Sequence, residues 1–117
     1  MKIDLTYLKN MSNGNKDLIV EMIDIFKTQV VEFTEGMDDY YQNKQFELLG
    51  RLAHKAKSSI SIMGLNDLAL ELKNFEYLAK EGKEIEKFPL FISNFKKETR
   101  DALEELDEVV KNIDIYI

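Results

Sequence analysis

RLAHKAKSSISIMG, residues 51–64, is the stretch that most clearly indicates the fold of this chain, and it contains the only histidine, His54. At 100° per residue it predicts a helix with two different faces. The apolar face, which we expect to be buried, consists of Leu48, Leu49, Leu52, Ala53, Ala56, Ile60 and Met63. The opposite face spans an arc of roughly 120° and consists of Glu47, Gly50, Arg51, His54, Lys57, Ser58 and Ser61. We therefore predict an amphipathic helix over residues 45–63 that exposes His54.

The residues around His54 are either cationic or small. Arg51 and Lys57 lie three positions away on the same face, where they can reach a group bound to the imidazole. A neutral imidazole is a good phosphoryl acceptor, and a nearby cation stabilises the charge on phosphoryl oxygens. The small residues, which leave room for an approaching partner, are Gly50, Ser58 and Ser61. This pattern suits phosphoryl transfer between proteins, although it is also compatible with an ordinary surface histidine in a chain with 16 lysines and arginines.

The N-terminal part of the chain predicts two helices. A short helix or helical turn is expected within residues 1–11, because Ile3, Leu5, Leu8 and Met11 recur at helical spacing. Residues 12–15 then break it, and Asn13 or Asn15 is expected to cap the next helix. That helix, over residues 16–42, has an apolar stripe of Ile19, Met22, Ile23, Phe26, Val30, Phe33, Met37 and Tyr40. Gly36 lies within this helix and marks either a bend or a close approach.

The C-terminal part predicts two more helices. Gly64 is expected to end the His54 helix in the left-handed conformation, and Asn66 to cap a helix that ends at Gly82. So short a connection forces an antiparallel hairpin. After a loop at residues 85–88, Pro89 fits the first turn of a last helix that reaches about residue 113. We predict an all-α fold, an antiparallel four-helix bundle with a short extra N-terminal helix, with residues 1–117 as one domain.

The composition narrows the function. The net charge of −6 argues against broad nucleic-acid binding, and no apolar run approaches the roughly 20 residues that a membrane span needs. The chain contains no cysteine, and its first residues do not have the pattern of a signal segment, so we expect a cytoplasmic protein. We also expect a monomer. A single histidine without a Glu-x-x-His pair predicts no metal site. The lack of nucleotide-binding glycine loops predicts no cofactor and no use of ATP as a kinase.

The run LAHKAKSSISIMGL, residues 52–65, resembles the histidine-phosphotransfer (HPt) domain of two-component phosphorelays. The spacing His54-x-x-Lys57, followed by Gly64, is similar to the family's Ala-His-x-Leu-Lys-Gly-Ser pattern followed by glycine. The Asn13-Gly14 turn and Leu72-x-x-Phe75-Glu76 also resemble the family layout, so the likeness covers most of residues 3–82. It implies that His54 accepts a phosphoryl group from the aspartyl phosphate of a receiver domain and passes it to another receiver.

Two departures from the family pattern accompany this resemblance. Ser58 stands where the family usually has glycine, and Ala56 where it often has leucine. From their spacing around His54, we expect Lys57 to stabilise the phosphoryl charge and Gly50, Arg51, Ser58 and Ser61 to face the partner. Two alternatives remain open: a protein that binds a receiver without being phosphorylated, and an unrelated helical adaptor.

Glu76 is the remaining candidate. In a hairpin that turns at residues 64–65, positions equally far from the turn lie level, which places Glu76 beside His54. Glu76 could then accept a hydrogen bond from the imidazole and orient it. The simpler interpretation is a solvated carboxylate on an exposed helix face.

Overall fold

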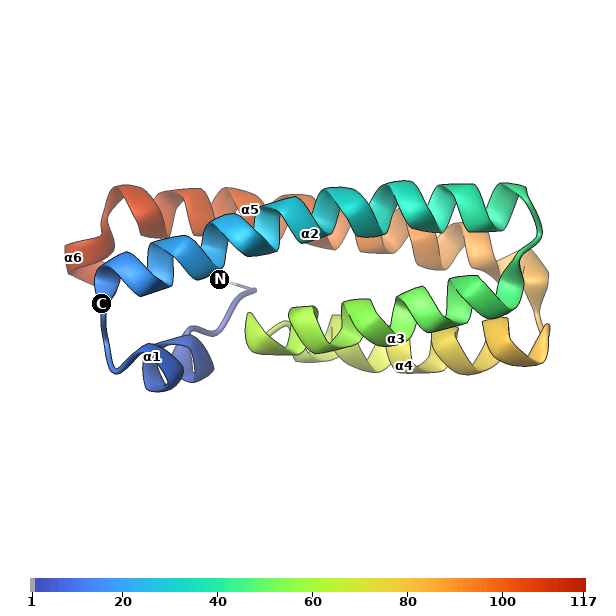
Figure 1. The fold of residues 1–117 in the computed structure, drawn as a ribbon, viewed down its shortest axis with the longest axis horizontal. Helices are drawn as coiled ribbons and strands as arrows, with labels where there is room; N and C mark the ends of the chain where they lie inside the picture. Colours follow the sequence, from blue (N-terminus) through green and yellow to red (C-terminus); the bar gives the residue numbers. More distant parts are fainter. Residues whose placement is uncertain (1) are drawn as a thin grey trace.

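The computed structural model describes residues 2–117, and this part of the chain folds into helices without a strand. Four long helices form the antiparallel bundle predicted from the sequence, about 46 Å long and 20 Å wide (Figure 1). They are α2 (Lys16–Gln42), α3 (Phe46–Ile62), α4 (Asn66–Glu81) and α5 (Phe88–Lys111). The smaller elements are α1 (Thr6–Ser12), the 3₁₀ turn η1 (Ile85–Lys87) and α6 (Ile113–Tyr116). No helix within residues 2–117 combines the length and apolar character that a membrane span requires.

The ends of these helices follow local chemistry. The side chain of Asn15 accepts a hydrogen bond from the backbone N–H of Leu18 and so caps α2, as one of the two predicted alternatives requires. Gly82 ends α4 with a φ of +64°, and Pro89 lies in the first turn of α5. The prediction for Asn66 was wrong: it is the first residue of α4, the preceding position is Leu65, and no side chain caps this helix.

The α3–α4 hairpin turns at Gly64, which adopts a φ of +74° as predicted. Glycine is needed there for a second reason, because a Cβ atom would lie 2.5 Å from both the Cβ atom and the carbonyl oxygen of Asp4. The backbone N–H of Asp4 also donates a 3.0 Å hydrogen bond to the carbonyl of Met63. The N-terminal segment therefore lies directly on the turn of the hairpin.

The long helices are unequal, and the N-terminal segment compensates for the difference. α2 and α5 have 27 and 24 residues, whereas α3 and α4 have 17 and 16, so the hairpin leaves one end of the α2–α5 pair uncovered. Residues 2–5 and α1 occupy the space beyond the hairpin turn, below the blue end of α2 (Figure 1). Their apolar contributions to the core are Ile3, Leu5 and Leu8.

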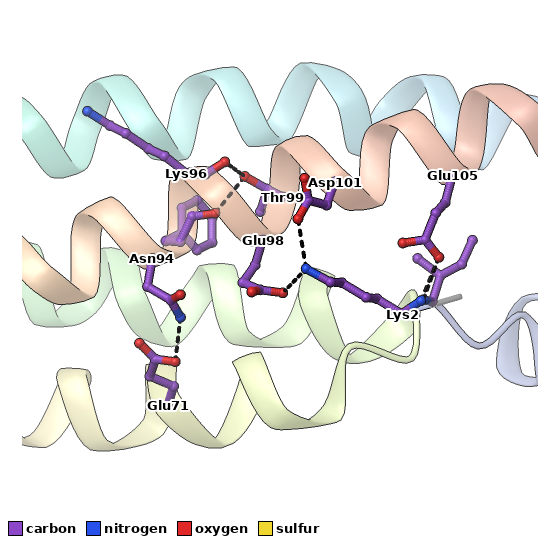
Figure 2. Close-up of polar contacts among 10 residues, drawn as sticks. Lys2, Glu71, Asn94, Lys96, Glu98, Thr99, Asp101 and Glu105 are labelled. Carbon is purple, nitrogen blue, oxygen red and sulfur yellow. Dashed lines mark hydrogen bonds and ion pairs between the residues drawn. The ribbon is translucent and has the colours of Figure 1, made fainter.

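Lys2 connects this segment to α5 through two ion pairs and a backbone hydrogen bond. Its ammonium group lies 2.7 Å from the carboxylate of Asp101 and 3.0 Å from that of Glu98, and its backbone nitrogen donates to Glu105 at 2.6 Å (Figure 2). The predicted helix within residues 1–11 begins only at Thr6, so the prediction was wrong for residues 2–5, which are not helical. Residue 1 lies outside the described residues.

The interior of α1 also differs from the prediction. Met11 is 54% exposed, whereas Ser12 is buried beside Leu8, one helical turn earlier. The Ser12 hydroxyl donates to the carbonyl of Lys9, so its burial leaves no unpaired group.

The predicted core of the bundle is otherwise present. On α2 the fully buried positions are Ile19, Ile23, Phe26, Val30, Phe33 and Met37. Gly36 marks a close approach, because a Cβ atom there would lie 2.7 Å from a methyl carbon of Leu52. The predicted loop at residues 85–88 contains η1 and ends at the buried Phe88, whose ring packs edge-on against Phe75. Leu48, expected to be buried, is 38% exposed.

Candidate functional site

His54 lies near the middle of α3 and its side chain is 60% exposed, as predicted. Its Nδ1 atom lies 3.0 Å from Oε1 of Glu76 on α4, a residue 22 positions later in the chain. The Glu76 side chain is only 15% exposed. The structure therefore contains the hydrogen-bonded arrangement, and the simpler interpretation of Glu76 as a solvated carboxylate was wrong.

Glu76 contacts two lysines as well as the histidine. The ammonium group of Lys80 lies 2.8 Å from Oε2, and that of Lys57 lies 3.6 Å from Oε1. Burial alone raises the pKa of Glu76, but the hydrogen bonds from Lys80 and His54 outweigh it and hold the pKa below its ordinary value of 4.5. We call His54, Lys57, Glu76 and Lys80 the carboxylate cluster. At its centre is a carboxylate that stays ionised at neutral pH.

The ionised carboxylate determines which imidazole nitrogen is nucleophilic. A carboxylate without a proton can only accept hydrogen bonds, so Nδ1 of a neutral His54 must donate its N–H to Glu76. The lone pair then resides on Nε2, the nitrogen that does not face Glu76. The cluster thus selects one tautomer of an exposed imidazole and presents Nε2 as the reactive atom.

A groove of about 310 Å³ lies beside His54, between α3 and α4. It is lined by His54, Lys57, Lys73, Glu76, Tyr77, Lys80 and Glu81. The three lysines outnumber the two glutamates of this groove, so its net charge is positive and favours an anionic group near the imidazole. Lys73 and Lys80 were not predicted as site residues. Their signal was available, because residues three and four positions from Glu76 on a helix share its face.

The predicted partner-facing residues are arranged in different ways. Arg51 is exposed, but its guanidinium pairs with Glu47 at 2.9 Å instead of turning toward the imidazole. Ser58 and Ser61 are both exposed and line a second groove of about 340 Å³ together with Tyr7 and Ile62. Tyr7 comes from α1 and is 51% exposed, so this face extends beyond the helix that supplies the histidine.

The expectation that Gly50 faces a partner rests on an exposure that the structure contradicts. Gly50 is buried under α4. A Cβ atom at this position would lie 2.7 Å from Cγ of Lys80 and 3.1 Å from the carbonyl oxygen of Glu76. The small size of Gly50 allows α3 and α4 to pack closely at this position.

Metal coordination has no counterpart in the described residues, 2–117: no three side chains of His, Cys, Asp or Glu converge to hold an ion. No protein-family model, curated protein or solved structure matches the chain.

Proposed function

We propose that this protein is an HPt-like phosphoryl carrier, in which His54 accepts a phosphoryl group from the aspartyl phosphate of one receiver domain and transfers it to a second receiver. The observation that supports this proposal is the 3.0 Å contact between Nδ1 of His54 and the ionised Glu76 on an otherwise exposed face. This contact selects the tautomer that leaves Nε2 unprotonated, which is the form that a phosphoryl acceptor requires.

In the proposed reaction, the Nε2 lone pair attacks the phosphorus atom of the aspartyl phosphate. The P–O bond to the aspartate breaks, the aspartate leaves as a carboxylate, and an Nε2–P bond forms. Because Nδ1 keeps its hydrogen, the phosphorylated ring carries a positive charge next to Glu76, which stabilises it. In the second transfer, the aspartate carboxylate of another receiver attacks phosphorus, and the electrons of the Nε2–P bond return to the imidazole.

Lys57 is the proposed partner of the phosphoryl oxygens. Its ammonium group lies 3.6 Å from the same Glu76 oxygen that contacts His54, so it is already on the imidazole side of the carboxylate. Phosphoryl transfer has a loose transition state with charge on the equatorial oxygens, and a cation beside the reacting imidazole stabilises that charge. In this proposal the protein acts in the cytoplasm as a monomer, and ATP is consumed by another protein.

The test is phosphoryl transfer from a panel of radiolabelled, phosphorylated receiver domains of the same organism. We expect an acid-labile, base-stable phosphate on His54, and its loss when an unphosphorylated second receiver is added. His54→Gln should keep the helical circular dichroism of the parent and acquire no label. Receiver binding without any transfer would instead support the non-phosphorylated binding protein. Label on the His54→Gln variant would contradict the proposal.

A further inference from the structure

Gly50 lies one helical turn before His54, at a position where α3 is in close contact with the backbone of α4. A Cβ atom at this position would lie 3.1 Å from the carbonyl oxygen of Glu76, 3.2 Å from the backbone nitrogen of Lys80 and 2.7 Å from its Cγ atom. Glycine weakens the interior of a helix relative to alanine. Here it allows two helix backbones to touch.

The residues that Gly50 contacts are the two members of the carboxylate cluster on α4. Glu76 reaches across to Nδ1 of His54 at 3.0 Å, and Lys80 holds the other oxygen of that carboxylate at 2.8 Å. The stem of Lys80 lies over Gly50 before its ammonium group reaches Glu76. The absence of a side chain at Gly50 therefore permits both contacts of the Glu76 carboxylate, the one with His54 and the one with Lys80.

We propose that Gly50 is a positioning residue for His54: it sets the spacing between α3 and α4 at which the Glu76 carboxylate reaches Nδ1 and leaves Nε2 free. The effect on the tautomer is independent of the proposed function. Its relevance to phosphorylation rests on the proposed function.

Alanine at position 50 cannot be accommodated by a side-chain rotation alone. The contacts with the Glu76 carbonyl and the Lys80 nitrogen involve backbone atoms, so α4 must move outward by a few tenths of an ångström. The Lys80 stem must also turn away. Both movements lengthen the contacts of Glu76. Its hydrogen bond to His54 is already 3.0 Å long, and such bonds rarely exceed about 3.2 Å.

The chain supplies a matched control in Gly36, the other glycine within a long helix. A Cβ atom there would meet only the end of the Leu52 side chain, at 2.7 Å, which can rotate. Gly36→Ala therefore makes the same chemical change on α2, outside the groove of the carboxylate cluster.

The experiment measures the tautomer of His54 by ¹⁵N NMR at pH 9, where imidazoles are neutral. We expect the parent and Gly36→Ala to show mainly the Nδ1–H form. In Gly50→Ala the ratio of Nδ1–H to Nε2–H should fall about tenfold, as expected when a hydrogen bond to a charged group is lost. A parent-like ratio in folded Gly50→Ala, or an equal fall in Gly36→Ala, would overturn the proposal.

If Gly50→Ala does not fold, Lys80→Ala and the double variant Gly50→Ala/Lys80→Ala provide the same comparison without the Cγ contact. The double variant should still show a lower Nδ1–H fraction than Lys80→Ala, because the backbone contacts remain; equal fractions would contradict the proposal. The rate of phosphorylation by phosphoramidate is measured in parallel. If the tautomer ratio changes in the variant but the parent is phosphorylated neither by phosphoramidate nor by a receiver domain, the role of Gly50 is upheld and the proposed function is rejected.

Discussion

Nδ1 of His54 and Oε1 of Glu76 lie 3.0 Å apart because the chain reverses direction at Gly64, which places the two residues level on neighbouring antiparallel helices. The carboxylate does more than orient one ring. Lys57 and Lys80 also contact it, so one mostly buried carboxylate holds the imidazole and two ammonium groups together. Each element of this arrangement can be tested separately.

Glu76→Gln should lower the stability of the protein in a pH-dependent way. The pKa of Glu76 is below 4.5 in the folded state, so its ionised form contributes stability above pH 4.5 that is lost as the pH falls through the lowered pKa. We expect the variant to be less stable than the parent by about 1 kcal/mol at pH 7. The difference should shrink at pH 3.5, as measured by urea unfolding. Glu81→Gln, which changes an exposed carboxylate of the same groove, is the control. A deficit that is equal at both pH values would refute this assignment.

Lys57 and Lys80 should affect phosphohistidine differently. Lys57 lies near the Glu76 oxygen that contacts the imidazole, whereas Lys80 binds the other oxygen. Lys57→Ala should slow transfer or shorten the phosphohistidine lifetime by an amount worth about 1–3 kcal/mol, the range for charge-assisted hydrogen bonds. Lys80→Ala should have a smaller effect on lifetime. Decay of ³²P-labelled protein measures both, and a larger effect of Lys80→Ala would reverse the assigned roles.

Ser58→Gln tests whether the exposed face of α3 is a docking surface. Ser58 lines the groove next to Tyr7 and Ser61, so a longer side chain would hold a receiver away from the imidazole. Transfer from a receiver should fall sharply, since the reacting atoms must approach to roughly 3–3.5 Å. Phosphorylation by phosphoramidate, which needs no docking surface, should change little.

Ser93→Gln serves as the control for Ser58→Gln. Ser93 is also an exposed serine on a helix, but it belongs to α5, which contributes no residue to either groove beside α3. This variant should accept phosphate from a receiver at the parent rate. If Ser58→Gln does the same, the docking surface lies elsewhere.

Gly64→Ala and Gly82→Ala together measure the contribution of the N-terminal segment. Both glycines have a positive φ, but only at Gly64 would a Cβ atom collide, with Asp4. Gly82→Ala should cost about 1 kcal/mol of unfolding free energy from backbone strain alone. Gly64→Ala should cost about 2–5 kcal/mol, because the collision adds to the strain. Chemical denaturation measures both, and equal losses would mean that Asp4 yields without cost.

The sequence predicted the features that depend on periodicity and local chemistry. The long helices were identified from apolar spacing, and Asn15, Gly82 and Pro89 mark helix ends through their backbone preferences. The level position of Glu76 followed from the hairpin geometry alone. What the pattern could not decide was whether the carboxylate turned toward the ring or toward water, which depends on the positions of the lysines around it.

The errors have physical causes as well. Glycine has no side chain whose polarity indicates burial, so its helical position grouped Gly50 with its polar neighbours, although α4 packs directly against it. The step from Ile3 to Leu5 fits a non-helical segment as well as a helix, and tertiary contacts with Met63 and α5 hold residues 2–4 in a non-helical conformation. Such long-range contacts leave no periodic signal.

Because the bundle helices are unequal in length, we expect local stability to differ between the two halves of the molecule. Where α3 and α4 pair, four long helices surround the core, and His54 lies in this half. The other end relies on α1 and residues 2–5, and a seven-residue helix is not stable alone. Amide hydrogens of α1 should therefore exchange with solvent through local opening, whereas those of α3 next to His54 should exchange only when the whole bundle unfolds. The imidazole would then keep its orientation while the far end of the same molecule opens and closes.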